Sequence, residues 1–211
     1  MNRFRFFFHR IPGDWLVYGI MGTNVLIFFC FGVAETAFKN GDPQLLKWMY
    51  ENSTSSAENI RQGRLWTLVT SAFAHQATDH LFMNTLGLWM FCPAVAQSLG
   101  SYAFLKVYLT GAIGCDLMSA YWNQNRFTRS MGASGALCAI MSFTACMSPR
   151  ASVALYGIIP MPLWAVVAGI FLYDLYGARS RGHVSTDFAG HIGGTLTGMG
   201  LFLVRRRLGI P

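Results

Sequence analysis

Six apolar segments dominate this sequence, most of them close to the roughly 20 residues that an α-helix needs to cross a lipid bilayer. Backbone N–H and C=O groups cannot stay unpaired in hydrocarbon, so only helices and closed barrels cross a membrane, and these segments are too long for barrel strands. The sequence therefore predicts an all-α, polytopic membrane protein, a bundle of six transmembrane helices. The expected helices cover residues 15–38, 80–99, 102–122, 134–147, 161–176 and 188–204.

Composition and charge agree with a membrane environment. Charged residues are 12% of the 211 residues and hydrophobic residues 53%, whereas an average soluble domain has about 25% charged residues. The net charge of +7 arises partly from arginines at the ends of the apolar segments, namely Arg3, Arg5, Arg10, Arg205, Arg206 and Arg207. Arginines in such positions typically face lipid headgroups. Because no motif that reads RNA or DNA is present, we expect the lipid bilayer as a partner and no nucleic acid.

The expected organisation is one domain with two short ends. Residues 1–14 form a basic N-terminal segment, residues 15–204 the six-helix domain, and residues 205–211 a basic C-terminal tail. The first ten residues are rich in Arg and Phe and contain no acidic residue, which partly fits a mitochondrial targeting segment. The five cysteines follow no metal-ligand spacing, so neither a metal site nor a cofactor is expected.

Two connections need separate interpretation. The longest connection, residues 39–65, mixes charged residues with apolar and aromatic ones, which favours a segment lying at the membrane interface. Its centre, residues 52–59, is rich in Ser, Asn and Thr and is expected to be mobile. The apolar stretch 151–159 precedes the fifth helix, from which Pro160 and Pro162 separate it.

A serine and a histidine inside the apolar segments are candidates for nucleophilic catalysis. Ser134 lies in Gly132-Ala133-Ser134-Gly135 at the start of the fourth segment, where a helix start offers free N–H groups and the positive end of the helix dipole to a developing oxyanion. The simpler interpretation of Ser134 is that it only caps the helix. His191 lies in the sixth segment, and a neutral imidazole can act as general base toward a serine hydroxyl.

Small residues at helical spacing predict that these two segments touch. Gly190, Gly194 and Gly198 form one stripe on the sixth segment. Ser134, Cys138, Ser142 and Cys146 form another on the fourth. Small side chains let membrane helices approach closely, so packing the two stripes together would bring Ser134 to His191.

A second pair of polar residues lies on an earlier segment. His80 and Asn84 are four residues apart and therefore share one helix face. Both donate hydrogen bonds, so together with the Ser134 N–H they are candidates for an oxyanion hole. Ordinary hydrogen bonding between helices is the alternative. Asp187 could orient His191 or could equally cap its helix, so we predict a Ser–His dyad and no triad.

Taken together, these fragments resemble the rhomboid family of intramembrane serine proteases, and most closely its mitochondrial, presenilin-associated branch. The landmarks follow in order: Leu65-Trp66-Thr67, His75, His80 with Asn84, Gly132-Ala133-Ser134-Gly135, and Gly190-His191-Ile192-Gly193-Gly194. The chain departs from the family at Thr67, where many members have Arg.

The resemblance implies a role for each matching residue. Ser134 would be the nucleophile, His191 the base, and His80 and Asn84 the oxyanion donors. It also implies a six-helix bundle, transmembrane proteins as substrates, and a place in the mitochondrial inner membrane.

Other functions have weaker support from the sequence. The main alternative is a catalytically silent rhomboid-like subunit of a larger inner-membrane protein complex, although this chain keeps both Ser134 and His191. An aspartyl intramembrane protease would use Asp116 and Asp174, but Cys115 stands where that class requires glycine. A metalloprotease is less expected because no HExxH motif occurs, and a transporter because no helix repeat is evident.

Overall fold

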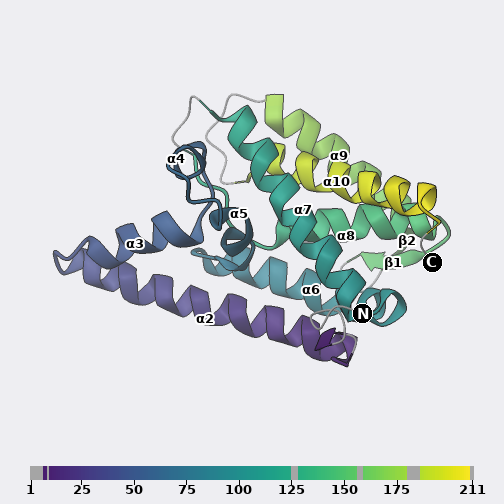
Figure 1. Ribbon diagram of the computed structural model, residues 1–211, viewed down its shortest axis with the longest axis horizontal. Helices are drawn as coiled ribbons and strands as arrows, with labels where there is room; N and C mark the ends of the chain where they lie inside the picture. Colours follow the sequence, from purple (N-terminus) through teal and green to yellow (C-terminus); the bar gives the residue numbers. More distant parts are fainter. Residues whose placement is uncertain (1–6, 9, 125–127, 156–158, 180–185, 210–211) are drawn as a thin grey trace.

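The computed structural model describes the structure of residues 7–8, 10–124, 128–155, 159–179 and 186–209. Arg3 and Arg5, and with them most of the expected targeting segment, lie outside the described residues. Most of the described chain is helical (Figure 1).

Six long helices in the described part of the chain match the six predicted segments. They are α2 (Gly13–Lys39), α6 (Thr78–Leu99), α7 (Ser101–Trp122), α8 (Ser134–Met147), α9 (Leu163–Arg179) and α10 (Phe188–Arg207). The observed ends lie within about three residues of the predicted ones. Helix α10 continues through the basic cluster 205–207 that was expected to form a tail.

Helix length and composition identify two of these helices as able to cross a membrane. Within the described residues, α2 and α7 are long and apolar enough for a crossing. Helix α8 is apolar but has only 14 residues. A mostly helical protein is therefore established, and the count of six crossings stays a prediction.

A β-hairpin interrupts the helical pattern and corrects the all-α prediction. Strand β1 (Ser152–Leu155) pairs antiparallel with β2 (Ile159–Pro162) in the register Ser152↔Pro162. Pro160 and Pro162 lack the N–H that a helix interior requires, whereas a two-stranded edge tolerates proline. The Leu163 N–H donates to Ala151 O at 2.8 Å and leads the chain into α9.

The connection from α2 to α6 folds back on the bundle in short helices. These are α3 (Gln44–Ser53), α4 (Ala57–Arg61), α5 (Thr67–Thr70) and the 3-10 turn η1 (Ser71–Phe73). Helix α3 returns along α2 (Figure 1), and Met49 of α3 is buried against Phe31 and Ala34 of α2. An apolar helix face packed on a membrane-length helix is consistent with the predicted interfacial segment.

The expectation that residues 52–59 are mobile is wrong, because burial and hydrogen bonds fix this segment. Thr54 is fully buried, and Ser55 pairs with Ser130 through two backbone hydrogen bonds of 2.9 and 2.8 Å. Ser56 accepts from the Asn59 N–H at 3.1 Å and caps α4. The Asn59 amide donates to Tyr50 O and Thr54 O.

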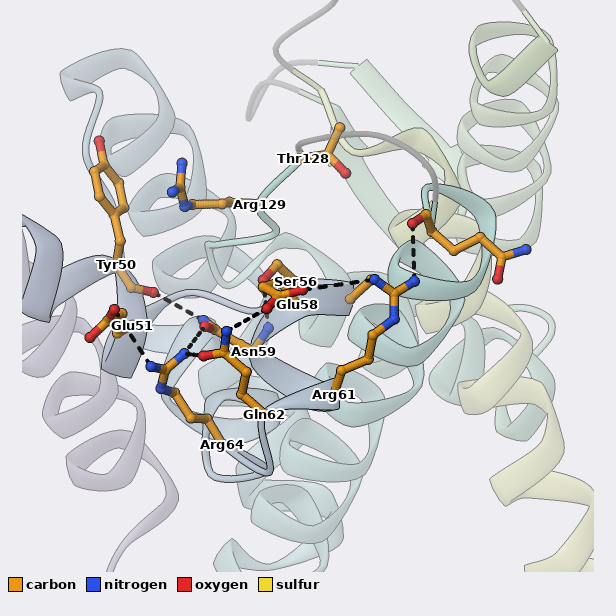
Figure 2. A pocket seen from close by; sticks show the side chains of 12 residues that line it. Tyr50, Glu51, Ser56, Glu58, Asn59, Arg61, Gln62, Arg64, Thr128 and Arg129 are labelled. Atoms are coloured by element: carbon orange, nitrogen blue, oxygen red, sulfur yellow. Dashed lines mark hydrogen bonds and ion pairs between the residues drawn. The ribbon is translucent and has the colours of Figure 1, made fainter.

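A polar hollow on this connection contains its ion pairs (Figure 2). Arg64 contacts Glu51 at 3.5 Å and donates to Asn59 Oδ1 at 3.0 Å. Arg61 donates to Gln124 O at 3.2 Å, across to the end of α7. These contacts anchor the connection to the helices, and none of the candidate catalytic residues lines this hollow.

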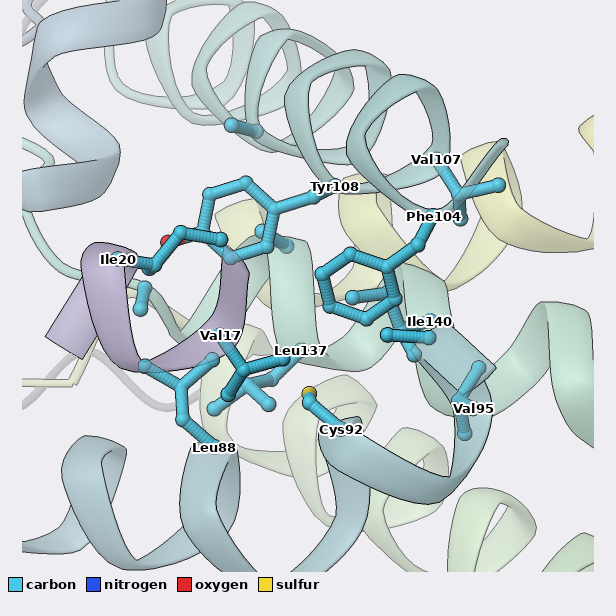
Figure 3. Packing of buried hydrophobic residues seen from close by; sticks show 14 of the residues in the cluster. Val17, Ile20, Leu88, Cys92, Val95, Phe104, Val107, Tyr108, Leu137 and Ile140 are labelled. Atoms are coloured by element: carbon cyan, nitrogen blue, oxygen red, sulfur yellow. The ribbon is translucent and has the colours of Figure 1, made fainter. Parts of the chain in front are cut away.

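The main core lies where α2, α6, α7 and α8 meet (Figure 3). Leu88 and Cys92 of α6 and Phe104 and Tyr108 of α7 are fully buried there. Such a cluster keeps the helices from shifting along one another, because interiors are close-packed. The Tyr108 hydroxyl donates to Ala72 O at 3.1 Å. The buried polar group of this large side chain therefore has a hydrogen-bond partner.

Glycines bring α10 into backbone contact with α8, as the small-residue stripes predicted. A side chain at Gly194 would collide with the carbonyl of Gly135, and one at Gly198 with the carbonyl of Ala139. Ser142 of α8 adds a hydrogen bond of 2.9 Å to Thr195 O. Close approach of this kind is typical of membrane helices that pack through small residues.

One detail of the predicted stripes is wrong. Ser134 and Ser142 of the predicted α8 stripe do contact α10, and Gly135 and Ala139 beside them form the close backbone contacts. Gly190 faces α7, since a Cβ there would lie 2.8 Å from Cys115 Sγ. A pattern of small residues in the sequence indicates which helices can pack closely. It does not show which neighbouring helix each small residue contacts.

Replacement of Gly198 tests this packing. We expect Gly198→Ala to destabilise the folded state by about 1–3 kcal/mol, because the added methyl overlaps the Ala139 carbonyl. Thermal unfolding in detergent micelles measures the change. Gly200→Ala is the matched control, because nothing lies within 4 Å of a Cβ on Gly200. Equal melting temperatures for the two variants would contradict the proposed contact.

Candidate active site

The turn before α8 lies against His80 and Asn84 of α6 at Gly132, two residues before Ser134. Gly132 has φ of 115°, a conformation that L side chains rarely adopt. A Cβ on Gly132 would lie 2.5 Å from His80 Cε1 and 3.5 Å from Asn84 Nδ2. Glycine is therefore required here for both backbone conformation and space, and the turn contacts the polar face of α6.

Backbone and side-chain hydrogen bonds hold this turn in place. The Gly132 N–H donates to Ser71 O at 2.9 Å, and the Ala133 N–H lies 3.4 Å from His75 Nε2. Ser71 in turn donates its hydroxyl to the buried carboxylate of Asp116 on α7 at 2.5 Å. The turn is thus fixed by Ser71 of η1, by His75 two residues after η1 and, indirectly, by Asp116 of α7.

His75 serves this turn as a neutral acceptor. The side chain is fully buried between η1 and α6. Burial, with the nearby His80 adding to it, lowers the pKa of His75 from its ordinary value to about 4. A neutral imidazole keeps one nitrogen lone pair, so His75 can accept the Ala133 N–H at physiological pH.

Ser134 is the first residue of α8 and does not cap it. The cap position is Ala133, and no side chain closes this helix start. The interpretation that Ser134 is only a cap is therefore wrong. The first-turn N–H groups of a helix have no partner within the helix, and the positive end of the helix dipole lies at this end, beside Ser134.

The structure brings Ser134 and His191 into hydrogen-bonding contact. Ser134 Oγ lies 2.9 Å from His191 Nε2, although the two residues are 57 positions apart in the sequence. The His191 side chain is 17% exposed and Ser134 is partly exposed. The pair is therefore accessible to a reactant while its two helices are held by the glycine contacts described above.

A carboxylate also contacts His191, which corrects the predicted absence of a third partner. Asp174 Oδ1 of α9 lies 3.1 Å from His191 Nδ1. Asp187, the residue considered from the sequence, instead accepts the Gly190 N–H at 3.0 Å and caps α10. The expectation that no carboxylate is placed to orient His191 is therefore wrong, and the Ser–His dyad itself stays a prediction.

His80 and Asn84 lie on one face of α6, as their spacing predicted. The Asn84 amide donates to His80 O at 3.0 Å within the helix and is buried. The amide group carries two N–H donors, so one remains for another acceptor. Both side chains adjoin Gly132, because a methyl group added at that glycine would meet each of them.

The two buried aspartates belong to separate clusters. Asp116 contacts Ser71, and Asp174 contacts His191. An aspartyl protease needs its two carboxyl groups to share a proton. Among the described residues no hydrogen bond joins Asp116 to Asp174, so the geometry favours serine chemistry over the aspartyl alternative.

Sequence reasoning missed three contributors to the site, namely Ser71, His75 as an acceptor, and Asp174. One signal in the sequence pointed to Asp174: ionisable residues inside apolar helices are expensive and are therefore functional candidates. No comparable signal exists for Ser71, because its contribution to the turn comes through its backbone carbonyl.

Comparison with known proteins identifies the family of this chain. The sequence matches the rhomboid domain family over residues 62–208. It is 33% identical over 196 residues to RHOMBOID-like protein 12, mitochondrial, of Arabidopsis thaliana, a match that covers 85% of this chain and 55% of that protein. It is 30% identical over 190 residues to Rhomboid protein 1, mitochondrial, of Saccharomyces cerevisiae, covering 87% and 51%.

A vertebrate relative is more distant. The chain is 27% identical over 193 residues to Presenilin-associated rhomboid-like protein A, mitochondrial, of Danio rerio, covering 89% of this chain and 47% of that protein. The chain spans about half the length of these curated relatives. With a domain match over more than half of its residues, the chain belongs to the rhomboid family.

Proposed function

We propose that this chain is an intramembrane serine protease that cleaves transmembrane protein substrates. Ser134 is its nucleophile and His191 its general base. The six long helices cross the bilayer, and no metal or cofactor takes part. The observation that carries the proposal is the 2.9 Å contact between Ser134 Oγ and His191 Nε2.

The proposed reaction follows the chemistry of acyl transfer. His191 Nε2 takes the hydroxyl proton as Ser134 Oγ attacks the substrate carbonyl carbon. Collapse of the tetrahedral intermediate breaks the C–N bond, and the imidazolium protonates the leaving amine. Water, deprotonated by the same imidazole, then hydrolyses the acyl ester and restores Ser134.

Developing negative charge requires donors close to Ser134. The Ser134 N–H at the start of α8 and the side chains of His80 and Asn84 supply them. Support comes from Gly132, whose missing side chain leaves His80 and Asn84 directly beside the turn. Donors placed in advance need no reorganisation when charge appears, which makes them effective in a water-poor site.

Substrate reaches Ser134 from the side, through the gap between α6 and α9. A transmembrane helix has its carbonyl groups paired within the helix, so it must unwind locally before cleavage. Helix α8 is short, with 14 residues, which leaves room for water above Ser134 within the thickness of a bilayer.

The names of the relatives suggest a subcellular location for this chain. Three of them are named as mitochondrial proteins, and we propose that this chain lies in the mitochondrial inner membrane. One relative is named as presenilin-associated. A silent subunit of a larger inner-membrane complex is the competing function, and the contact between serine and base favours the protease.

Loss of the nucleophile tests the proposal directly. Ser134→Ala should reduce cleavage of a reporter transmembrane substrate in proteoliposomes by about 10⁴-fold or more, because no other group can form the acyl-enzyme. A fluorophosphonate probe should label the wild-type protein and not the variant.

The control for this experiment is Ser142→Ala, which removes a serine hydroxyl from the same helix at the α10 contact. It should keep both cleavage and labelling. Folded wild-type protein that is neither labelled by the probe nor able to cleave the reporter would contradict the protease and support the silent subunit.

The oxyanion donors give a second test. His80→Ala and Asn84→Ala should each lower kcat by about 10²-fold to 10³-fold, the usual effect of losing one such donor. KM should change little, since the donors act on charge that exists only in the transition state. Unchanged kcat in both variants would assign these residues to helix packing.

A further inference from the structure

Asp174 is placed where an uncompensated carboxylate would be expensive. It lies on α9 and its side chain is 2% exposed. The residues of α9 that are buried with it are Leu163, Val166, Val167 and Gly177. Burial of a charge among apolar groups is tolerated when a partner compensates it.

The contacts of Asp174 identify that partner. Oδ1 lies 3.1 Å from His191 Nδ1, whereas Oδ2 is buried without a hydrogen-bond partner in the described part of the chain. Helix packing alone does not explain a carboxylate that contacts one imidazole and leaves its other oxygen unpaired. A neighbouring imidazole that takes up a proton would supply the positive charge that such a carboxylate lacks.

The two helices are held together at this point by independent contacts. Gly177 of α9 has no side chain, and a Cβ there would lie 2.6 Å from the ring of Phe188 on α10. Tyr173, next to Asp174, packs edge-on against the same ring with centroids 5.5 Å apart. The distance between Asp174 and His191 is therefore set by neighbouring aromatic packing.

We propose that Asp174 is a positioning residue for His191, an assignment that rests on the proposed protease function. By accepting a hydrogen bond from Nδ1–H, Asp174 selects the tautomer in which Nε2 is unprotonated and faces Ser134. It also stabilises the imidazolium that forms when His191 takes the serine proton. The same division of roles operates in Ser–His–Asp hydrolases of unrelated fold.

Other titratable groups near His191 do not fill this role. Asp187, on the same helix, accepts the Gly190 N–H. His80 of α6 faces His191 as a second imidazole and carries no negative charge. Cys138 of α8 lies near Asp174. Among these groups Asp174 alone combines a negative charge with contact to Nδ1.

The decisive variant is Asp174→Asn in the full-length protein. Asparagine keeps the size of the side chain, but its N–H₂ can donate to Nδ1 and so force the proton onto Nε2, where it blocks attack. We expect kcat to fall by roughly 10²-fold to 10⁴-fold, by analogy with the loss on the same change in a Ser–His–Asp triad. KM should stay within a few-fold, and the melting temperature should be kept.

Two companion variants separate positioning from packing. Asp174→Glu keeps the carboxylate but fits worse, so it should retain more activity than Asp174→Asn if charge matters. Phe188→Leu loosens the packing of α9 on α10 without removing the carboxylate. It should lower the melting temperature clearly while changing kcat less than Asp174→Asn does. The reverse ranking, with Asn more active than Glu, would assign Asp174 to packing and overturn the proposal.

A readout that needs no proteolysis keeps the two proposals distinguishable. In ¹⁵N-histidine-labelled protein, the His191 signals should show a protonated Nδ1 in the wild type and a shift toward protonated Nε2 in Asp174→Asn. An unchanged tautomer in the variant would overturn the role of Asp174. Absence of Ser134-dependent cleavage together with the expected tautomer change would contradict the protease alone.

Discussion

The close approach of α10 to α8 is the constraint on which the rest of the site depends. Gly194 and Gly198 place one helix against the carbonyl groups of Gly135 and Ala139 on the other. Any side chain at these glycines would separate the helices, and a hydrogen bond of 2.9 Å between Ser134 and His191 does not survive a shift of an ångström or more. Backbone packing therefore determines whether the nucleophile and base can meet at all.

The second requirement is a rigid turn in front of α8. Gly132 adopts a left-handed conformation, and its N–H is bound by Ser71, which is itself tied to Asp116 on α7. The turn thereby keeps the start of α8 beside His80. Proposed catalytic groups from three helices, α6, α8 and α10, converge on this point, and in each case a glycine allows the approach.

The two buried carboxylates of the bundle each contact a polar side chain of another element. Asp116 accepts the Ser71 hydroxyl, whereas Asp174 contacts the His191 imidazole. The first carboxylate therefore supports the turn before α8, and the second is proposed to position the base. Because a lipid environment offers no water to a misplaced charge, such groups restrict how the helices can rearrange. The same restriction keeps the proposed base in one orientation.

Apolar length and helical periodicity are local properties, so the six long helices could be predicted from the sequence alone. The face shared by His80 and Asn84 could be predicted too, since a spacing of four residues is about one helix turn. Motif order also pointed to Ser134 and His191. The contact of Asp174 with His191, the role of Asp187 as a cap and the pairing of strand β1 with β2 could not be predicted from the sequence. These depend on which helix faces meet, and that is set by packing between segments distant in the chain.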